Sequence, residues 1–112
     1  MPRYLISFDD GAMTFPEEDL PAVAAASHQV VDAAKAARVW IFGGGLLRQR
    51  ARIVAPDGTV TDGPDPEPKA VLGGVAIIDV PTREEALAWA AKIAVACRCA
   101  QEVREIMDDP DS

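Results

Sequence analysis

The stretch GGVAIIDVPTREEALAWAAKIA, residues 73–94, predicts a strand followed by a helix. Residues 74–80 are apolar at nearly every position, as expected of a central strand that is covered on both faces. Thr82 stands three residues before Glu85, which is the spacing of a capping box at a helix start. Trp89 lies beside the stripe of this helix that we expect to face inward, which consists of Ala86, Ala90, Ile93 and Ala94.

The N-terminal part of the chain has the same alternation of strand and helix. Residues 3–8 are rich in strand formers, with Tyr4, Ile6 and Phe8 on one face. Residues 17–37 carry apolar side chains at helical spacing. The regular helix should begin near Pro21, because proline is tolerated in a first turn. Residues 39–42 predict a second strand, which we expect to bend at the glycines 43–45.

The segment between these two parts predicts a hairpin and a loop. Residues 52–55 and 59–61 are short strand-like runs around Asp57-Gly58, a pair that supports the positive φ of a tight turn. Residues 62–68 contain three prolines and a glycine, so we expect an exposed loop there. Residues 102–107 predict a last strand, and residues 108–112 a loose tail.

The order of elements predicts an α+β fold of the ferredoxin-like type. Strand, helix, strand, hairpin, strand, helix, strand places both helices on one face of an antiparallel sheet. A chain of 112 residues makes one domain. The second sheet face would be a large exposed apolar patch in a monomer, so we expect a homodimer that packs two such faces together around a cavity.

Composition and motifs argue against several classes of function. A net charge of −7 disfavours nucleic acid, and the apolar runs are far shorter than the roughly 20 residues that span a membrane. No signal peptide is visible at the N-terminus. Cys97 and Cys99 are too close together to staple distant segments, so we expect reduced thiols in the cytoplasm. The zinc ligand set is incomplete and residues 43–45 lack the context of a phosphate loop, so we expect no metal and no cofactor.

His28 is the first candidate for chemistry. It is the only histidine, and histidine is the side chain that ordinarily titrates near neutral pH, so an acid–base step would fall to it first. Asp32 follows one helical turn later and can hold the imidazole. The alternative is a solvated helix surface, because pairs of this kind are common there.

Further candidates lie in and around the loop. Asp62 can orient a ligand or accept a proton, but an aspartate before Gly-Pro also caps its own turn. Lys69 follows the loop and can face a carboxylate. Arg48, Arg50 and Arg52 share one face of a regular strand, which suits either an anion or a solvated sheet edge.

Residues 61–74, TDGPDPEPKAVLGG, resemble the signature of YCII-related proteins of the DGPF type, in which Asp-Gly-Pro-aromatic is followed by Glu, Lys and Leu-Gly-Gly. The matching positions are Asp62, Gly63, Pro64, Glu67, Lys69, Leu72, Gly73 and Gly74. Asp65 and Val75 stand where the family has aromatic residues, so the roles of those rings are not carried over. His28 matches the histidine on the family's first helix.

The resemblance implies a ferredoxin-like fold that forms dimeric α/β barrels, in agreement with the order of elements. Some relatives are small-molecule enzymes for which a histidine and an aspartate are proposed as an acid–base pair. We therefore take His28 and Asp62 as catalytic candidates, and Lys69, Arg48 and Asp32 as candidates for binding a small anionic metabolite in a pocket between the sheet and the first helix. Other members resemble accessories of extracytoplasmic-function sigma factors, so a non-catalytic interaction module is the alternative.

Overall fold

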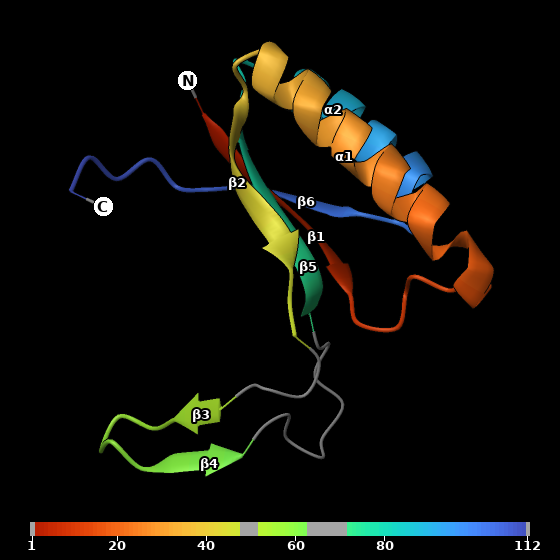
Figure 1. The fold of residues 1–112 in the computed structure, drawn as a ribbon. Coiled ribbons are helices and arrows are strands. Elements are labelled where there is room, and N and C mark those ends of the chain that lie inside the picture. The colour runs from red at the N-terminus through yellow and green to blue at the C-terminus, as the bar shows by residue number, and fades with distance from the viewer. Residues whose placement is uncertain (1, 48–51, 63–71, 112) are drawn as a thin grey trace.

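The computed structural model describes residues 2–47, 52–62 and 72–111, which form a four-stranded antiparallel sheet, two helices and a separate two-stranded hairpin (Figure 1). The sheet has the strand order β2-β5-β1-β6. Along the chain the elements are β1 (Arg3–Asp9), the 3₁₀ turn η1 (Glu17–Asp19), α1 (Leu20–Ala36), β2 (Trp40–Gly45), β3 (Arg52–Val54), β4 (Val60–Asp62), β5 (Leu72–Asp79), α2 (Arg83–Cys97) and β6 (Glu102–Glu105). The expected ferredoxin-like α+β fold is confirmed.

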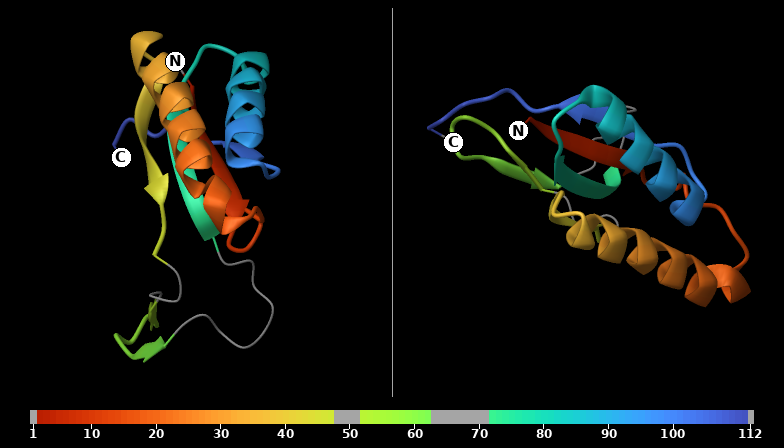
Figure 2. Two further views of the ribbon diagram at one scale, coloured as in Figure 1. Left: turned by 45° about the vertical axis from the view of Figure 1, so that its right-hand side comes forward. Right: turned by 90° about the horizontal axis from the view of Figure 1, so that it is seen from above.

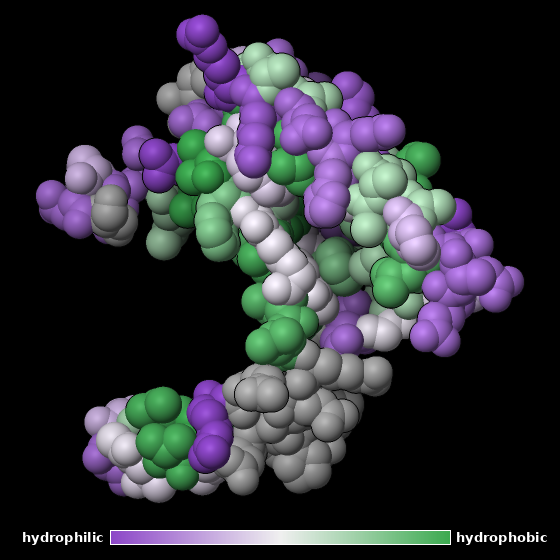
Figure 3. Space-filling model, in the orientation of Figure 1, coloured by the Kyte–Doolittle hydropathy of each residue, from purple (hydrophilic) through white to green (hydrophobic). Residues whose placement is uncertain are grey.

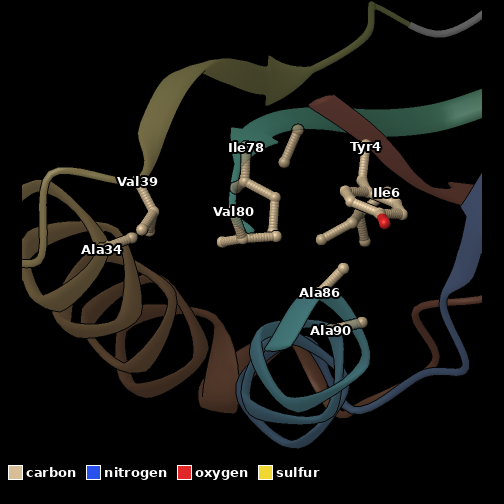
Figure 4. Packing of buried hydrophobic residues seen from close by; sticks show 9 residues of the cluster. Tyr4, Ile6, Ala34, Val39, Ile78, Val80, Ala86 and Ala90 are labelled. Carbon is tan, nitrogen blue, oxygen red and sulfur yellow. The ribbon is translucent and has the colours of Figure 1, made fainter. Parts of the chain in front are cut away.

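The hydrophobic core lies between one face of the sheet and the two helices. Alternation along β1 and β5 places Tyr4 opposite Ile78 and Ile6 opposite Ala76, and all four side chains are buried. Figure 4 shows small side chains of α2 pointing toward β1, and Ala34 of α1 beside Val39. The buried cluster consists of Tyr4, Ile6, Ala34, Val39, Ala76, Ile78, Val80, Ala86 and Ala90. Alanines on both helices let them approach the sheet closely.

The helix ends follow from local chemistry. The hydroxyl oxygen of Thr82 accepts a hydrogen bond from the Glu85 N–H at 3.2 Å, which caps α2 as the sequence predicts. Pro21 lies in the first turn of α1. Each helix is followed by an arginine in the left-handed region, Arg38 with φ 63° and Arg98 with φ 58°. The guanidinium of Arg98 also donates to Asp19 at 2.7 Å, which ties the end of α2 to the start of α1.

The register of β2 shifts before its glycines, between Trp40 and Phe42. Trp40 pairs with Ile78 and Phe42 pairs with Ile77. Ile41 is therefore the extra residue of a β-bulge. Gly43, Gly44 and Gly45 then pair in regular register. Of these glycines, only Gly43 has a side chain close to its Cβ position, that of Trp40, and nothing lies within 4 Å of the Cβ position of Gly44.

The hairpin β3–β4 extends away from the sheet (Figure 1). Its register pairs Arg52 with Asp62 and Val54 with Val60, so the second strand begins one residue later than predicted. Gly58 has φ 88°, and the Asp57 carboxylate accepts a hydrogen bond from the Thr59 N–H at 2.8 Å. Of the expected loop at 62–68, Asp62 is instead part of β4, and the remainder lies outside the described residues.

The helices cover a single face of the sheet, as both views in Figure 2 show. The expectation that β5 is covered on both faces therefore fails within one subunit. Leu5 and Ile77 pair across β1 and β5 on the second face and are half-buried, and Phe42, also opposite Ile77, is 66% exposed. Hydrophobic side chains also gather on the hairpin, across a concave side of the molecule (Figure 3). This uncovered face, with Leu5, Phe42 and Ile77, is called the open face below.

Candidate functional site

A cavity of about 410 Å³ lies between the sheet and α1. Strands β1, β2 and β5 form its floor, α1 forms its roof, and the C-terminal part of α2 closes one side. Its volume falls within the range of about 300–1,000 Å³ that is usual for small-molecule sites. It occupies the position that the sequence analysis expected for a pocket.

The floor consists of two aromatic rings that rest on glycines. A Cβ atom on Gly43 would lie 2.6 Å from Cη2 of Trp40, and a Cβ atom on Gly74 would lie 2.6 Å from the ring of Phe8. No real Cβ atom approaches a ring so closely, so these strands require glycine at both positions. Trp40 and Phe8 are half-buried, which leaves part of each ring accessible from the cavity.

The roof carries two basic residues of α1, His28 and Lys35. They stand seven residues apart, which is two helical turns, so they share one face of the helix. Both are exposed as well as lining the cavity, so they lie at its rim. No Asp or Glu in the described ranges lines this cavity. In a chain with a net charge of −7, this rim is a locally basic site.

Two other polar side chains of the lining, Ser27 and Gln101, donate hydrogen bonds within the protein. The Ser27 hydroxyl donates to the Val23 carbonyl at 2.9 Å and lies 3.5 Å from Sγ of the buried Cys97. The amide of Gln101 donates to the Cys99 carbonyl at 3.4 Å. Burial raises the pKa of the neighbouring Cys99 thiol, which keeps that sulfur protonated at neutral pH.

Of the site residues proposed from the sequence, the structure describes the side chains of His28 and Asp32. His28 lines the cavity, whereas Asp32 is exposed on α1, does not line it and forms no hydrogen bond or ion pair with His28. The backbone of Asp62 lies on β4, in the hairpin. Arg48 and Lys69 lie outside the described residues, and Arg52 of the predicted arginine ladder is exposed on β3.

Sequence reasoning missed Lys35, Trp40 and Phe8 as lining residues. Lys35 has a visible signal, because it follows His28 by two helical turns. Trp40 precedes a glycine by three residues, which also hints at a ring packed on backbone. The contact between Phe8 and Gly74 joins two strands that are far apart along the chain, so no local pattern reveals it.

A second and larger hollow of about 620 Å³ lies on the outer surface between α1 and α2. It is shallow and lined mainly by alanines and valines, with Gln29, Lys92 and Arg98 as its polar residues. It contains none of the site residues proposed from the sequence. The described residues contain no group of three or more His, Cys, Asp or Glu side chains placed to hold a metal ion. Neither α1 nor α2 combines the length and hydropathy that a membrane span requires.

Comparisons with known proteins agree with this fold. A solved structure that matches is 5-chloro-2-hydroxyhydroquinone dehydrochlorinase (TftG) from Burkholderia phenoliruptrix AC1100, in complex with 2,5-dihydroxybenzoquinone. The TM-score is 0.56 at 15% identity, and the match covers 99% of this chain and 98% of that one. No curated protein sequence matches. The YCII-related domain matches residues 4–109, nearly the whole length, so the chain belongs to the YCII-related domain family.

Proposed function

We propose that this chain is a homodimeric small-molecule-binding protein of the cytoplasm whose ligand occupies the cavity beneath α1. The observation that carries the proposal is the position of His28, the only histidine, on the rim of a cavity of about 410 Å³. A titratable group at the mouth of a mostly apolar cavity is the usual arrangement of a small-molecule site. The solved structure of TftG, which has a similar fold, is a complex with a small molecule, and this is consistent with such a use of the fold.

The proposed chemistry at this site is proton transfer by His28. Its imidazole lies at the rim, so it contacts both a bound ligand and solvent, and can exchange protons between them. Asp32 does not hold the imidazole in this subunit, so the ligand itself would fix the ring's orientation. Lys35, on the same helix face, would stabilise negative charge that develops on a ligand oxygen.

The open face supports the proposed homodimer. Leu5, Phe42 and Ile77 lie together on it, and no described helix covers them. Apolar sheet faces of this kind are stable in water when two copies bury them against each other. A second copy packed there would leave the cavity free, because the cavity lies on the opposite face of the sheet.

The first test is a native mass spectrum of the protein purified gently from its own host. We expect the native spectrum to show a dimer with the additional mass of a small molecule. That mass should be absent from a spectrum of the denatured protein. A bare dimer would instead favour the non-catalytic interaction module, and a monomer would contradict the dimer.

The second test is His28→Ala, with Asp32→Ala as a matched control on the same helix. Once a retained ligand has supplied a substrate, we expect His28→Ala to lower turnover about 10²- to 10⁴-fold, which is the usual contribution of a positioned acid–base group, and to leave the dimer intact. Asp32→Ala should change turnover little, because Asp32 lies outside the cavity lining. Equal turnover in His28→Ala and the parent protein would remove His28 from the chemistry.

A further inference from the structure

We propose that the cavity takes a flat aromatic anion, meaning a single aromatic ring that bears an ionised carboxylate or phenolate, with the ring over Phe8 and Trp40 and the charged oxygen toward His28 and Lys35. This inference rests on the proposed function, because it names the ligand class of the same cavity. It is drawn from the floor, the rim and the remaining polar groups of the lining.

The floor selects a ring. Phe8 lies on β1 and Trp40 on β2, which flank β5 on its two sides, so the strands that carry them are about 10 Å apart. Gly74 and Gly43 allow both rings to lie against the strands. A flat aromatic ligand that enters beneath α1 meets ring surface on both sides of β5. A puckered saturated ring of the same size cannot stack in this way.

The rim selects negative charge at one end of the ligand. His28 and Lys35 are the basic residues of the lining, and the described residues place no carboxylate there. Both lie on α1, above the floor, so the ligand's charge should point toward the roof and the mouth. A cationic ligand would meet Lys35 with no compensating acid.

The rest of the lining, which is mostly apolar, disfavours ligands with many hydroxyl groups. The Ser27 hydroxyl is bonded to the Val23 carbonyl, and the Gln101 amide to the Cys99 carbonyl. A sugar or polyol would therefore regain from the protein fewer hydrogen bonds than it gives up to water. A ligand with one charged end and an apolar ring gives up few hydrogen bonds to water when it enters the cavity.

Stacking should contribute at least as much selectivity as charge. An aromatic pair contributes a factor of roughly two to ten beyond the area that it buries. Lys35 is exposed, and ion pairs at exposed sites contribute a factor of about five at most. The ring should therefore matter at least as much as the charge.

The experiment is an NMR titration of the ¹⁵N-labelled protein with three matched probes. Benzoate has the ring and the charge, cyclohexanecarboxylate keeps the charge with a saturated ring, and benzamide keeps the aromatic ring without the charge. The indole N–H of Trp40 reports on the cavity, and that of Trp89, which does not line it, is the internal control. A Trp89→Phe variant assigns the two signals.

We expect benzoate to shift the Trp40 signal with a dissociation constant at least threefold below that of either other probe, with the Trp89 signal nearly unchanged. In Lys35→Gln the affinity for benzoate should fall two- to fivefold, and Lys35→Arg should restore it. Lys92→Gln is the matched control, because it removes the same charge from the surface over Trp89, outside this cavity, and should leave benzoate affinity unchanged.

Equal affinity for benzoate and cyclohexanecarboxylate would overturn the aromatic preference and leave the proposed function standing. Equal loss of affinity in Lys35→Gln and Lys92→Gln would overturn the assignment of the charged end to Lys35. Failure of all three probes to shift Trp40, in a protein whose native mass spectrum shows a retained ligand, would overturn this inference alone. The same failure without any retained ligand would overturn the proposed function as well.

Discussion

Gly74 shapes the cavity although it has no side chain. The ring of Phe8 occupies the space that a methyl group would need, at 2.6 Å from the position of a Cβ atom. The carbonyl oxygen of Gly44 lies 3.4 Å from the same Cβ position, so an added methyl group would be crowded on that side as well. Phe8 also lines the cavity. Gly74 therefore sets both the packing of β1 against β5 and the shape of the floor.

We expect Gly74→Ala to destabilise the fold by about 1–3 kcal/mol, because overpacking displaces Phe8. The measurement is urea unfolding followed by circular dichroism. Gly44→Ala is the matched control on the neighbouring strand: nothing lies within 4 Å of its Cβ position, so its effect should stay within about 0.5 kcal/mol. A similar cost for both variants would show that strand flexibility, and not the ring, explains the glycines.

At the residue scale, the sequence predicts which helix flank His28 occupies, and His28 lies on the cavity rim. Its catalytic role stays a prediction. Helical spacing places Asp32 near His28 but does not determine whether its side chain faces the cavity or solvent. The rings of the floor depend on contacts between strands, which a local pattern cannot contain.

Among the elements, the hairpin β3–β4 has a carboxylate, that of Asp57, bound to the backbone at its tip. The Thr59 N–H donates to Asp57, and this backbone hydrogen bond is the main cause that lowers the pKa of Asp57 from its usual value of 3.8. A lowered pKa in the folded state means that the interaction stabilises the turn above pH 3.8 and is lost as the pH falls through the folded value. Asp57 is exposed, so the effect should remain local.

We expect the Thr59 amide to lose its downfield NMR shift as the pH falls below about 3.8, while amides in β1 and β5 remain unchanged. Asp57→Ala should abolish this transition and give the low-pH shift at every pH. Asp109→Ala is the matched control, because the Asp109 carboxylate also accepts a backbone N–H two residues later, in the C-terminal segment. This variant should leave the pH dependence of the Thr59 amide unchanged. A Thr59 shift that does not follow pH in the parent protein would contradict the role of Asp57.

Element boundaries show where the sequence was sufficient. The capping box placed the start of α2 correctly, because Thr82 and Glu85 make a local hydrogen bond that the spacing specifies. The bulge at Ile41 could not be predicted from the sequence, because it arises from how β2 pairs with β5. Local chemistry fixes helix ends, whereas strand irregularities depend on the partner strand.

At the scale of the whole molecule, the open face should hold two copies together. We expect Phe42→Asp to weaken the dimer at least tenfold, because it places an unpaired carboxylate in the centre of the proposed interface. Sedimentation equilibrium measures the dissociation constant, and circular dichroism checks that the fold remains.

Val95→Asp is the matched control for this variant. Val95 is 80% exposed on the outer side of α2, so the same change of charge there should leave the dimer unchanged. Equal weakening by both variants would point to general charge repulsion, and a dimer unaffected by Phe42→Asp would place the interface elsewhere.

The end of β2 and the start of β5, between which the hairpin is inserted, are bonded to each other. Gly45 pairs with Gly74, and the Leu46 N–H donates to the Gly73 carbonyl at 2.9 Å. The two ends of the inserted segment are therefore held side by side by the sheet itself, whatever lies between them. The segment between Leu46 and Gly73 can therefore be lengthened, shortened or exchanged without disturbing the pairing of β2 with β5. A short turn grafted between Leu46 and Gly73 should yield a minimal version of this scaffold, on which new recognition loops can be mounted.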